Sequence, residues 1–218
     1  MNNLQKIAGW AAFLEAAIYI SAFVFFGAFW DFPSNVSNIE KFAFLADNQI
    51  ALSIVNLMMY VIFGALLAVL VSAIHQRLQK NAPALSQLAA IFGVIWVCLV
   101  IASGMIANVG LNTVLAISVK EPEQAMTIWL TINAIVEGVG GGNEVVGGLW
   151  VVLLSIAAIK VNEFPKMFNY FGLFVGFSGI ATVYPAEVLT EIFGLSQIVW
   201  FAWLGALMIS PPSQQLKN

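Results

Sequence analysis

Two carboxylates and two amides lie close together in a glycine-rich stretch, NAIVEGVGGGNEVVGGL, at residues 133–149. They are Asn133, Glu137, Asn143 and Glu144, and an apolar segment follows directly. Carboxylates in or beside hydrocarbon are costly, so they usually face a protein interior or a water-filled cavity. If the stretch is helical, the spacing of Asn133, Glu137 and Glu144 puts these three residues on one face. The pattern is typical of a polar site for a cation or a proton inside a membrane bundle.

The glycines of this stretch predict a break in the helix that contains it. A glycine inside a helix costs about 1 kcal/mol relative to alanine, and four of the five residues at 138–142 are glycine. We therefore expect a break or a sharp bend between Glu137 and Glu144. Residues 125–142 could then cross the membrane, re-enter it or lie on its surface.

Other polar side chains interrupt the remaining apolar segments at helical spacing. Residues four apart lie on the same face of a helix, so each such pair would give its helix one polar edge. At about 1.5 Å per residue, Glu15 lies roughly 13 Å from Lys6 and Glu144 roughly 24 Å from Lys160. These depths predict a polar vestibule that opens outward, with Glu15 at its floor. The polar pairs with a spacing of four residues are Glu15 with Tyr19, Asn56 with Tyr60, and Asn108 with Asn112.

A purely structural role is the alternative for these residues. Asparagine and tyrosine inside a membrane commonly form hydrogen bonds between helices, worth on average about 0.6 kcal/mol each. The two deep carboxylates, Glu15 and Glu144, have no lysine or arginine placed to pair with them. That arrangement favours a protonated carboxyl, a bound cation or hydrogen bonds to neighbouring amides.

The composition predicts an all-α integral membrane protein. Of the 218 residues, 61% are hydrophobic and 9% charged, whereas about a quarter of the residues of soluble domains are charged. The net charge of −3 and the lack of a basic block argue against nucleic acid as a partner. His75 is the only histidine and no lysine lies mid-segment, which argues against bis-histidine haem and a retinal Schiff base. No cofactor is identifiable from the residues.

Apolar segments of about 20 residues predict the membrane crossings. A polytopic bundle of six spans and a short outer amphipathic or re-entrant helix, at 123–137, forms one domain over residues 1–218. The predicted spans are 7–30, 50–74, 85–115, 143–161, 167–183 and 188–210.

The positions of the basic residues favour six spans over seven. With six spans and both termini cytoplasmic, the inner side holds six basic residues and the outer side holds only Lys41 and Lys120. This agrees with the excess of positive charge in cytoplasmic loops, whereas seven spans would divide that charge between the two sides. The six inner residues are Lys6, Arg77, Lys80, Lys160, Lys166 and Lys217.

The C-terminal third of the chain resembles a known family. Three segments carry the resemblance: GGLWVVLLSIAAIK, FPKMFNYFGLFVGFSGIAT and IFGLSQIVWFAWLGALM. They resemble an uncharacterised bacterial family of small, roughly six-helix integral membrane proteins. The resemblance implies the helix count and a bacterial inner membrane, and it assigns no catalytic residue.

Two functions are consistent with these patterns. The first is a channel or transporter for a small cation or proton that uses Glu15, Glu137 and Glu144. The second is a binding or accessory protein for a lipid, a quinone or another apolar ligand, without catalysis. No Ser-His, HExxH or paired-aspartate pattern is present, so we do not expect an enzyme. The expected partners are the lipid bilayer and a small cation or lipophilic ligand, and a homo-oligomer stays open.

Overall fold

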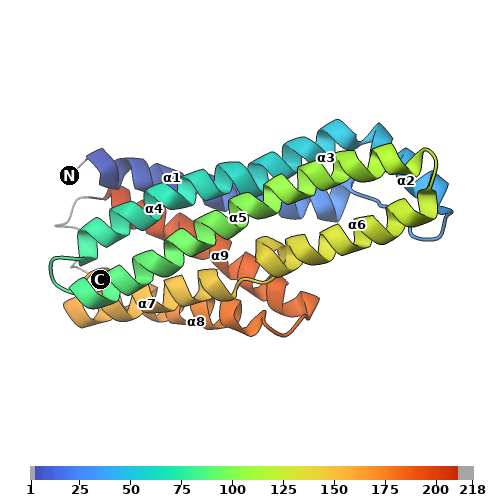
Figure 1. Ribbon diagram of the computed structural model, residues 1–218. Coiled ribbons are helices and arrows are strands. Elements are labelled where there is room, and N and C mark those ends of the chain that lie inside the picture. The colour runs from blue at the N-terminus through green and yellow to red at the C-terminus, as the bar shows by residue number, and fades with distance from the viewer. Residues whose placement is uncertain (1–2, 211–218) are drawn as a thin grey trace.

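The computed structural model describes residues 3–210, and every regular element in that range is helical. Figure 1 shows an elongated bundle whose helices run along one long axis. This confirms the predicted all-α bundle. The elements are α1 (Asn3–Val24), η1 (Phe25–Phe29), α2 (Asn38–Asp47), α3 (Gln49–Asn56), η2 (Leu57–Ile62), α4 (Phe63–Leu78), α5 (Pro83–Ser118), α6 (Pro122–Val136), η3 (Glu137–Gly141), α7 (Val145–Val161), α8 (Lys166–Ala181) and α9 (Glu187–Ile209), where η marks a π-helical turn.

Five helical stretches within residues 3–210 are long and apolar enough to cross a membrane. Large apolar side chains project from the bundle, such as Trp10, Val109 and Phe177, each at least 60% exposed. A surface of this kind suits lipid, so the chain is a membrane-embedded helical protein. The five stretches are Asn3–Phe29, Gln49–Leu78, Pro83–Ser118, Pro122–Val161 and Glu187–Ile209.

Helix α8 is the shortest of the predicted crossings. It has 16 residues and ends at Ala181, two residues before the predicted end of this span. At about 1.5 Å per residue it is roughly 24 Å long, less than the roughly 30 Å of a hydrocarbon core. It lies along α7, the neighbour against which it packs (Figure 1). The count of six full spans therefore stays a prediction.

Proline residues begin two of the described helices. Pro83 and Pro122 occupy the first turns of α5 and α6, where a missing N–H costs nothing. Helix α2 begins with a capping box between Ser37 and Glu40. The hydrogen bonds from Ser37 hold the pKa of the exposed Glu40 carboxyl below its ordinary value. These local signals set where α2, α5 and α6 begin.

Most basic residues of the described chain lie at one end of the bundle. The beginning of α1 and the end of α9 lie at the same end (Figure 1). An ion pair of 2.6 Å between Arg77 Nε and Glu163 Oε1 joins the end of α4 to the α7–α8 turn there. The Arg77 guanidinium also lies 4.6 Å from the ring centre of Phe164. Lys217, predicted on the same side, lies outside the described residues. We call this end the basic end.

We expect labelling from outside the cell to distinguish the two ends. In a Cys98→Ser background, single cysteines replace Lys80 and Asn162 at the basic end and Lys120 at the other. A membrane-impermeant maleimide applied to intact cells should label the cysteine at 120 alone, because the basic end is expected to face the cytoplasm. After lysis all three should react. Labelling at 80 or 162 in intact cells would contradict the predicted topology.

Helix α5 extends well beyond the rest of the bundle. Its 36 residues are roughly 54 Å long at about 1.5 Å per residue, against a hydrocarbon core of roughly 30 Å. The half away from the basic end packs with α2 and α6 around a separate small core. That core contains Phe42, Leu45, Leu111, Val114 and Ala125. The predicted outer helix at 123–137 corresponds to α6 and the first residue of η3.

The predicted break between Glu137 and Glu144 is confirmed. Helix α6 passes into the π-helical turn η3, non-helical backbone follows at 142–144, and α7 begins at Val145. Gly140 has φ 159° and ψ 19°, a combination that side chains with a Cβ rarely adopt. Because the helix does not continue, Glu137 and Glu144 do not share one helix face. The expectation of a common face is wrong for this reason.

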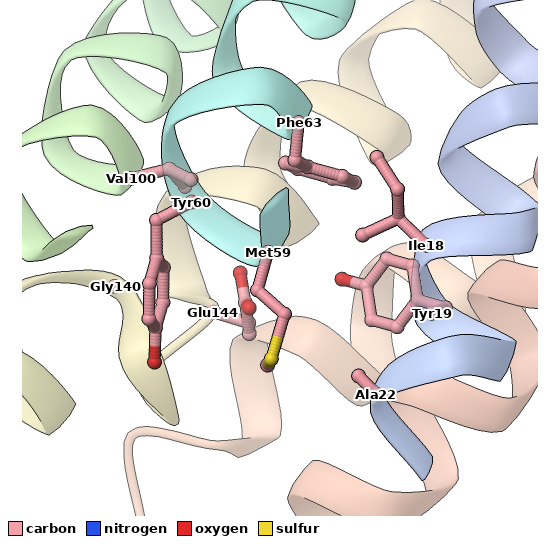
Figure 2. A pocket seen from close by; sticks show the side chains of 9 residues that line it. All are labelled: Ile18, Tyr19, Ala22, Met59, Tyr60, Phe63, Val100, Gly140 and Glu144. Carbon is pink, nitrogen blue, oxygen red and sulfur yellow. The ribbon is translucent and has the colours of Figure 1, made fainter. Parts of the chain in front are cut away.

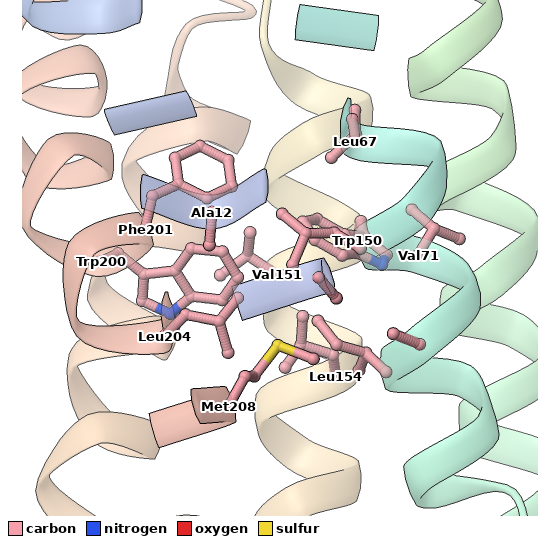
Figure 3. Packing of buried hydrophobic residues seen from close by; sticks show 14 of the residues in the cluster. Ala12, Leu67, Val71, Trp150, Val151, Leu154, Trp200, Phe201, Leu204 and Met208 are labelled. Carbon is pink, nitrogen blue, oxygen red and sulfur yellow. The ribbon is translucent and has the colours of Figure 1, made fainter. Parts of the chain in front are cut away.

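Aromatic side chains fill the core of the bundle between the break and the basic end. The ring centres of Trp96 and Trp150, of Trp150 and Trp200, and of Trp200 and Phe168 are each 5.7 Å apart. All four residues are at most 1% exposed. Figure 3 shows Trp150 and Trp200 packed among Leu67, Val151 and other aliphatic side chains from several helices. This half of the bundle is a solid core.

Candidate functional site

The carboxylate of Glu144 lies at the centre of the candidate site. Glu144 is 7% exposed and directly precedes the first residue of α7. The indole Nε1 of Trp96 donates a hydrogen bond of 3.0 Å to Glu144 Oε2. The backbone N–H of Glu144 donates to Thr182 Oγ1 at 2.7 Å, and that hydroxyl donates to Gly179 O at 2.7 Å. Trp96 of α5 thus holds the side chain of Glu144, and Thr182, directly after α8, holds its backbone.

The helix that follows Glu144 also affects its electrostatics. Unpaired N–H groups give the first turn of a helix a partial positive charge, which stabilises a nearby carboxylate by about 0.3–1 kcal/mol. The side chain of Glu144 does not cap the helix through a hydrogen bond. One carboxylate oxygen of Glu144 accepts the hydrogen bond from Trp96, and the side chain lines a cavity. Such a carboxylate can bind a cation.

A cavity of about 60 Å³ lies beside Glu144. Tyr19 comes from α1, Met59 and Tyr60 from η2, and Gly140 from η3. Figure 2 shows the Tyr19 ring and the Met59 side chain directed toward the space in front of Glu144. We call this space the carboxylate cavity. Its lining residues are Ile18, Tyr19, Ala22, Met59, Tyr60, Phe63, Val100, Gly140 and Glu144.

The carboxylate cavity continues into a larger hollow of about 390 Å³ between α1, η1 and the first turns of α9. Its lining shares Tyr19, Ala22, Met59 and Glu144 with the carboxylate cavity. The remaining walls are mostly aromatic or glycine. We call this space the apolar hollow. Its other lining residues are Phe23, Phe26, Gly27, Thr190, Glu191, Phe193 and Gly194.

A third space, of about 400 Å³, lies against Gly142 and Asn143. It includes two of the predicted site residues, Glu137 and Asn143, together with Glu187. We call it the outer hollow. Its lining shares only Thr190 with the apolar hollow and no residue with the carboxylate cavity. Among the described residues that line the three spaces, none is lysine, arginine or histidine.

Each of three π-helical turns contributes a lining residue to these spaces. Gly27 of η1 lines the apolar hollow, Tyr60 of η2 lines the carboxylate cavity, and Gly140 of η3 lines the same cavity. Hydrogen bonding from residue i to i+5 widens a helix locally, and such turns frequently occur at functional sites. Within residues 3–210 each π-helical turn thus contributes to the region around Glu144. The regular helices are distorted where the cavities form.

The predicted asparagines form an interhelical contact at a distance from the cavity. Asn56 Nδ2 donates to Asn108 Oδ1 at 3.0 Å, and Asn108 Nδ2 donates to Ser53 O at 3.2 Å. These bonds join α3 to α5, as the structural alternative predicts. Asn112 is exposed. None of these asparagines lines the three spaces described above.

The remaining predicted residues do not line the carboxylate cavity. Glu15 is fully buried, and neither of its carboxylate oxygens has a hydrogen-bond partner among the described residues. It lies one helical turn from Tyr19 and does not line the carboxylate cavity. Asn133 is half-buried on α6, and Glu137 is exposed. The structure therefore brings together Glu144, Tyr19 and Tyr60, with Glu15 in the protein interior.

Sequence reasoning did not identify Trp96 or Thr182 as parts of the site. Trp96 lies 48 residues from Glu144, and Thr182 lies 38 residues away. A tryptophan or a threonine inside an apolar segment gives no signal that separates a hydrogen-bonding partner from a packing residue. Only the packing of α5, α7 and α8 identifies their role.

We expect Trp96→Phe to reveal the strength of the bond to Glu144. Removing the indole leaves a buried carboxylate oxygen without its donor, which costs about 1–3 kcal/mol. The control is Trp200→Phe, because Trp200 is equally buried but its Nε1 has no partner among the described residues. Thermal unfolding in detergent should show a larger decrease for Trp96→Phe. Equal decreases would mean that the bond adds nothing to stability.

The fold and this site define a class, a polytopic α-helical membrane protein with a carboxylate cavity in its interior. No family model, curated protein sequence or solved structure matches this chain.

Proposed function

We propose that the protein binds a small amphipathic cation, such as an aromatic or alkyl ammonium ion, with its charge at Glu144. The observation that carries the proposal is the position of this buried carboxylate, where a small cavity meets a larger apolar hollow. The cavity of about 60 Å³ suits a charged head group, and the hollow of about 390 Å³ suits an apolar body. Glu144 supplies the opposite charge.

The walls of the carboxylate cavity support an organic cation as the ligand. Tyr19, Tyr60 and Phe63 present aromatic rings around the space in front of Glu144 (Figure 2). Aromatic faces attract cations by about 0.5–2 kcal/mol, and more strongly when water is excluded. A carboxylate in such surroundings is paired with a proton or with a cation. Exchange of one for the other is an elementary step of coupled transport.

The arrangement favours a carrier over an open channel. The core between Glu144 and the basic end is filled by Trp150, Trp200 and other buried side chains (Figure 3). A helix interrupted beside the binding residue, as at 142–144, is typical of transporters, whose discontinuous helices bind substrates near the midplane. We infer that the cation binds from the side opposite the basic end. A location in the bacterial inner membrane, with both termini cytoplasmic, belongs to this proposal.

A second candidate function is the binding of a neutral apolar molecule, such as a lipid or a quinone. The observation that favours it is the lining of the apolar hollow, where Phe23, Phe26 and Phe193 supply the walls. In that function Glu144 would serve as a hydrogen-bonding group, and the charge of the ligand would not affect its affinity.

Calorimetric titration of the purified protein separates the two candidates. Phenylbutylammonium and phenylbutanol have the same apolar body and differ in charge. The proposal predicts saturable binding of the ammonium ion and at least about tenfold weaker binding of the alcohol, a difference of about 1.4 kcal/mol. Equal affinities would favour the neutral ligand. The absence of saturable binding of either compound would contradict both candidates.

A further inference from the structure

We infer that the ligand reaches Glu144 sideways from the outer leaflet of the membrane, through the apolar hollow between η1 and the first turns of α9. This inference rests on the proposed function and specifies its ligand class: an amphiphile dissolved in lipid. The alternative route leads from water through the outer hollow. The two routes share only Thr190 among their lining residues, so they can be tested separately.

Hydrogen-bonded backbone at 142–144 lies between the outer hollow and the Glu144 carboxylate. Thr182 lines the outer hollow, and its hydroxyl accepts the backbone N–H of Glu144 at 2.7 Å. The hydroxyl of Thr190 donates to Gly142 O at 3.2 Å. The 142–144 segment is thus bonded on two sides to the α8–α9 region. It forms a floor under the outer hollow, and the outer hollow has no lining residue in common with the carboxylate cavity.

The apolar hollow, in contrast, leads directly to the carboxylate. Glu144 lines both the hollow and the cavity, as do Tyr19 and Met59. An apolar molecule in the hollow therefore already contacts the residues that surround Glu144.

The surface around the apolar hollow suits lipid. Phe26 and Phe29 of η1 are 42% and 74% exposed, and Val188 and Leu195 of α9 are 56% and 55% exposed. These apolar side chains flank the hollow on both of its helices. Glu191 lines the hollow and is exposed. A cationic head group at the membrane surface would meet Glu191 first and then Glu144, while its apolar body stays among aromatic side chains.

Two glycines allow a matched test of the routes. Gly27 lines the apolar hollow and Gly138 lines the outer hollow. A Cβ added at either position meets no atom within 4 Å, so neither substitution begins with a steric clash. In nanodiscs, the association rate of phenylbutylammonium is measured by stopped-flow tryptophan fluorescence. We expect Gly27→Leu to slow association at least tenfold and Gly138→Leu to leave it within twofold of the wild type. The reverse result, or equal rates, would overturn the lateral route.

A neutral photolabel tests the lateral route independently of cation binding at Glu144. A long-chain alcohol that carries a diazirine is added to the nanodisc lipid, and the photolabelled peptides are identified by mass spectrometry. We expect labelling to concentrate at residues 22–27 and 190–194 in the wild type and in Glu144→Gln, and to decrease severalfold in Gly27→Leu. Uniform labelling of all lipid-facing helices would overturn the lateral route, whatever the affinity for cations. If labelling concentrates as expected but no cation binds, the proposed function alone fails.

Discussion

Replacing Gly148 by leucine should prevent stable packing of α7 on α8. A Cβ at Gly148 would lie 2.5 Å from Gly176 O and 2.9 Å from the carbonyl carbon of Gly179, and both are backbone atoms. Backbone atoms cannot turn aside as a flexible side chain can, so the helices would have to separate. Overpacking costs about 1–3 kcal/mol and occasionally more. We expect about 3 kcal/mol or more, a large part of a typical stability of 5–15 kcal/mol.

The measurement is thermal unfolding of the purified protein in detergent. A loss of about 3 kcal/mol lowers the midpoint by roughly 6–12 °C in a chain of this size. Gly138→Leu is the control, since a Cβ there meets nothing within 4 Å. Its midpoint should stay within a few degrees of the wild type, because a glycine-to-leucine change in open space affects mainly helix propensity. Similar midpoints for the two variants would contradict the close α7–α8 packing.

The substitution Glu144→Gln should remove the binding of phenylbutylammonium while the fold is kept. The glutamine has the same shape and can still accept the hydrogen bond from Trp96 Nε1. It lacks the negative charge that the proposal assigns to the site. Losing one partner of a buried charge pair costs about 2–5 kcal/mol, so the affinity should fall about 30-fold or more. Calorimetric titration measures this directly.

Two comparisons make the Glu144→Gln result specific. Glu121→Gln removes a charge from an exposed position that lines none of the three spaces, so it should bind phenylbutylammonium like the wild type. Phenylbutanol should bind the wild type and Glu144→Gln with similar affinity, because it carries no charge for Glu144 to pair with. If Glu144→Gln binds the ammonium ion within threefold of the wild type, Glu144 does not supply the charge.

The sequence predicted the class and most of the helices because those depend on local chemistry. Long apolar segments imply membrane helices, and Pro83 and Pro122 mark where two of them begin. The cluster of glycines at 138–142 predicted the break before α7, which the structure confirms. The end of α8 was predicted two residues too late, because Thr182 and Val183 are as compatible with a helix as with the turn they form.

The sequence predicted only part of the site. The predictions failed where a helix is locally distorted and where a contact joins residues that are distant in sequence. Asn56 and Tyr60 are four residues apart and were expected to form one polar edge. The π-helical turn η2 begins between them and changes the spacing, so Asn56 bonds to Asn108 while Tyr60 lines the carboxylate cavity. Glu144 was predicted as a buried carboxylate, but its donor Trp96 lies on another helix. No periodicity in the sequence connects the two.

The position of a bound cation tests the central claim most directly. Crystals of the protein are soaked with a bromophenyl derivative of phenylbutylammonium, and bromine is located by its anomalous scattering. We predict one bromine peak in the apolar hollow between Phe23 and Phe193, with the ammonium group directed toward Glu144, and no such peak in crystals of Glu144→Gln. A peak in the outer hollow beside Glu137, or an unchanged peak in Glu144→Gln, would contradict the assignment of Glu144 as the cation-binding residue.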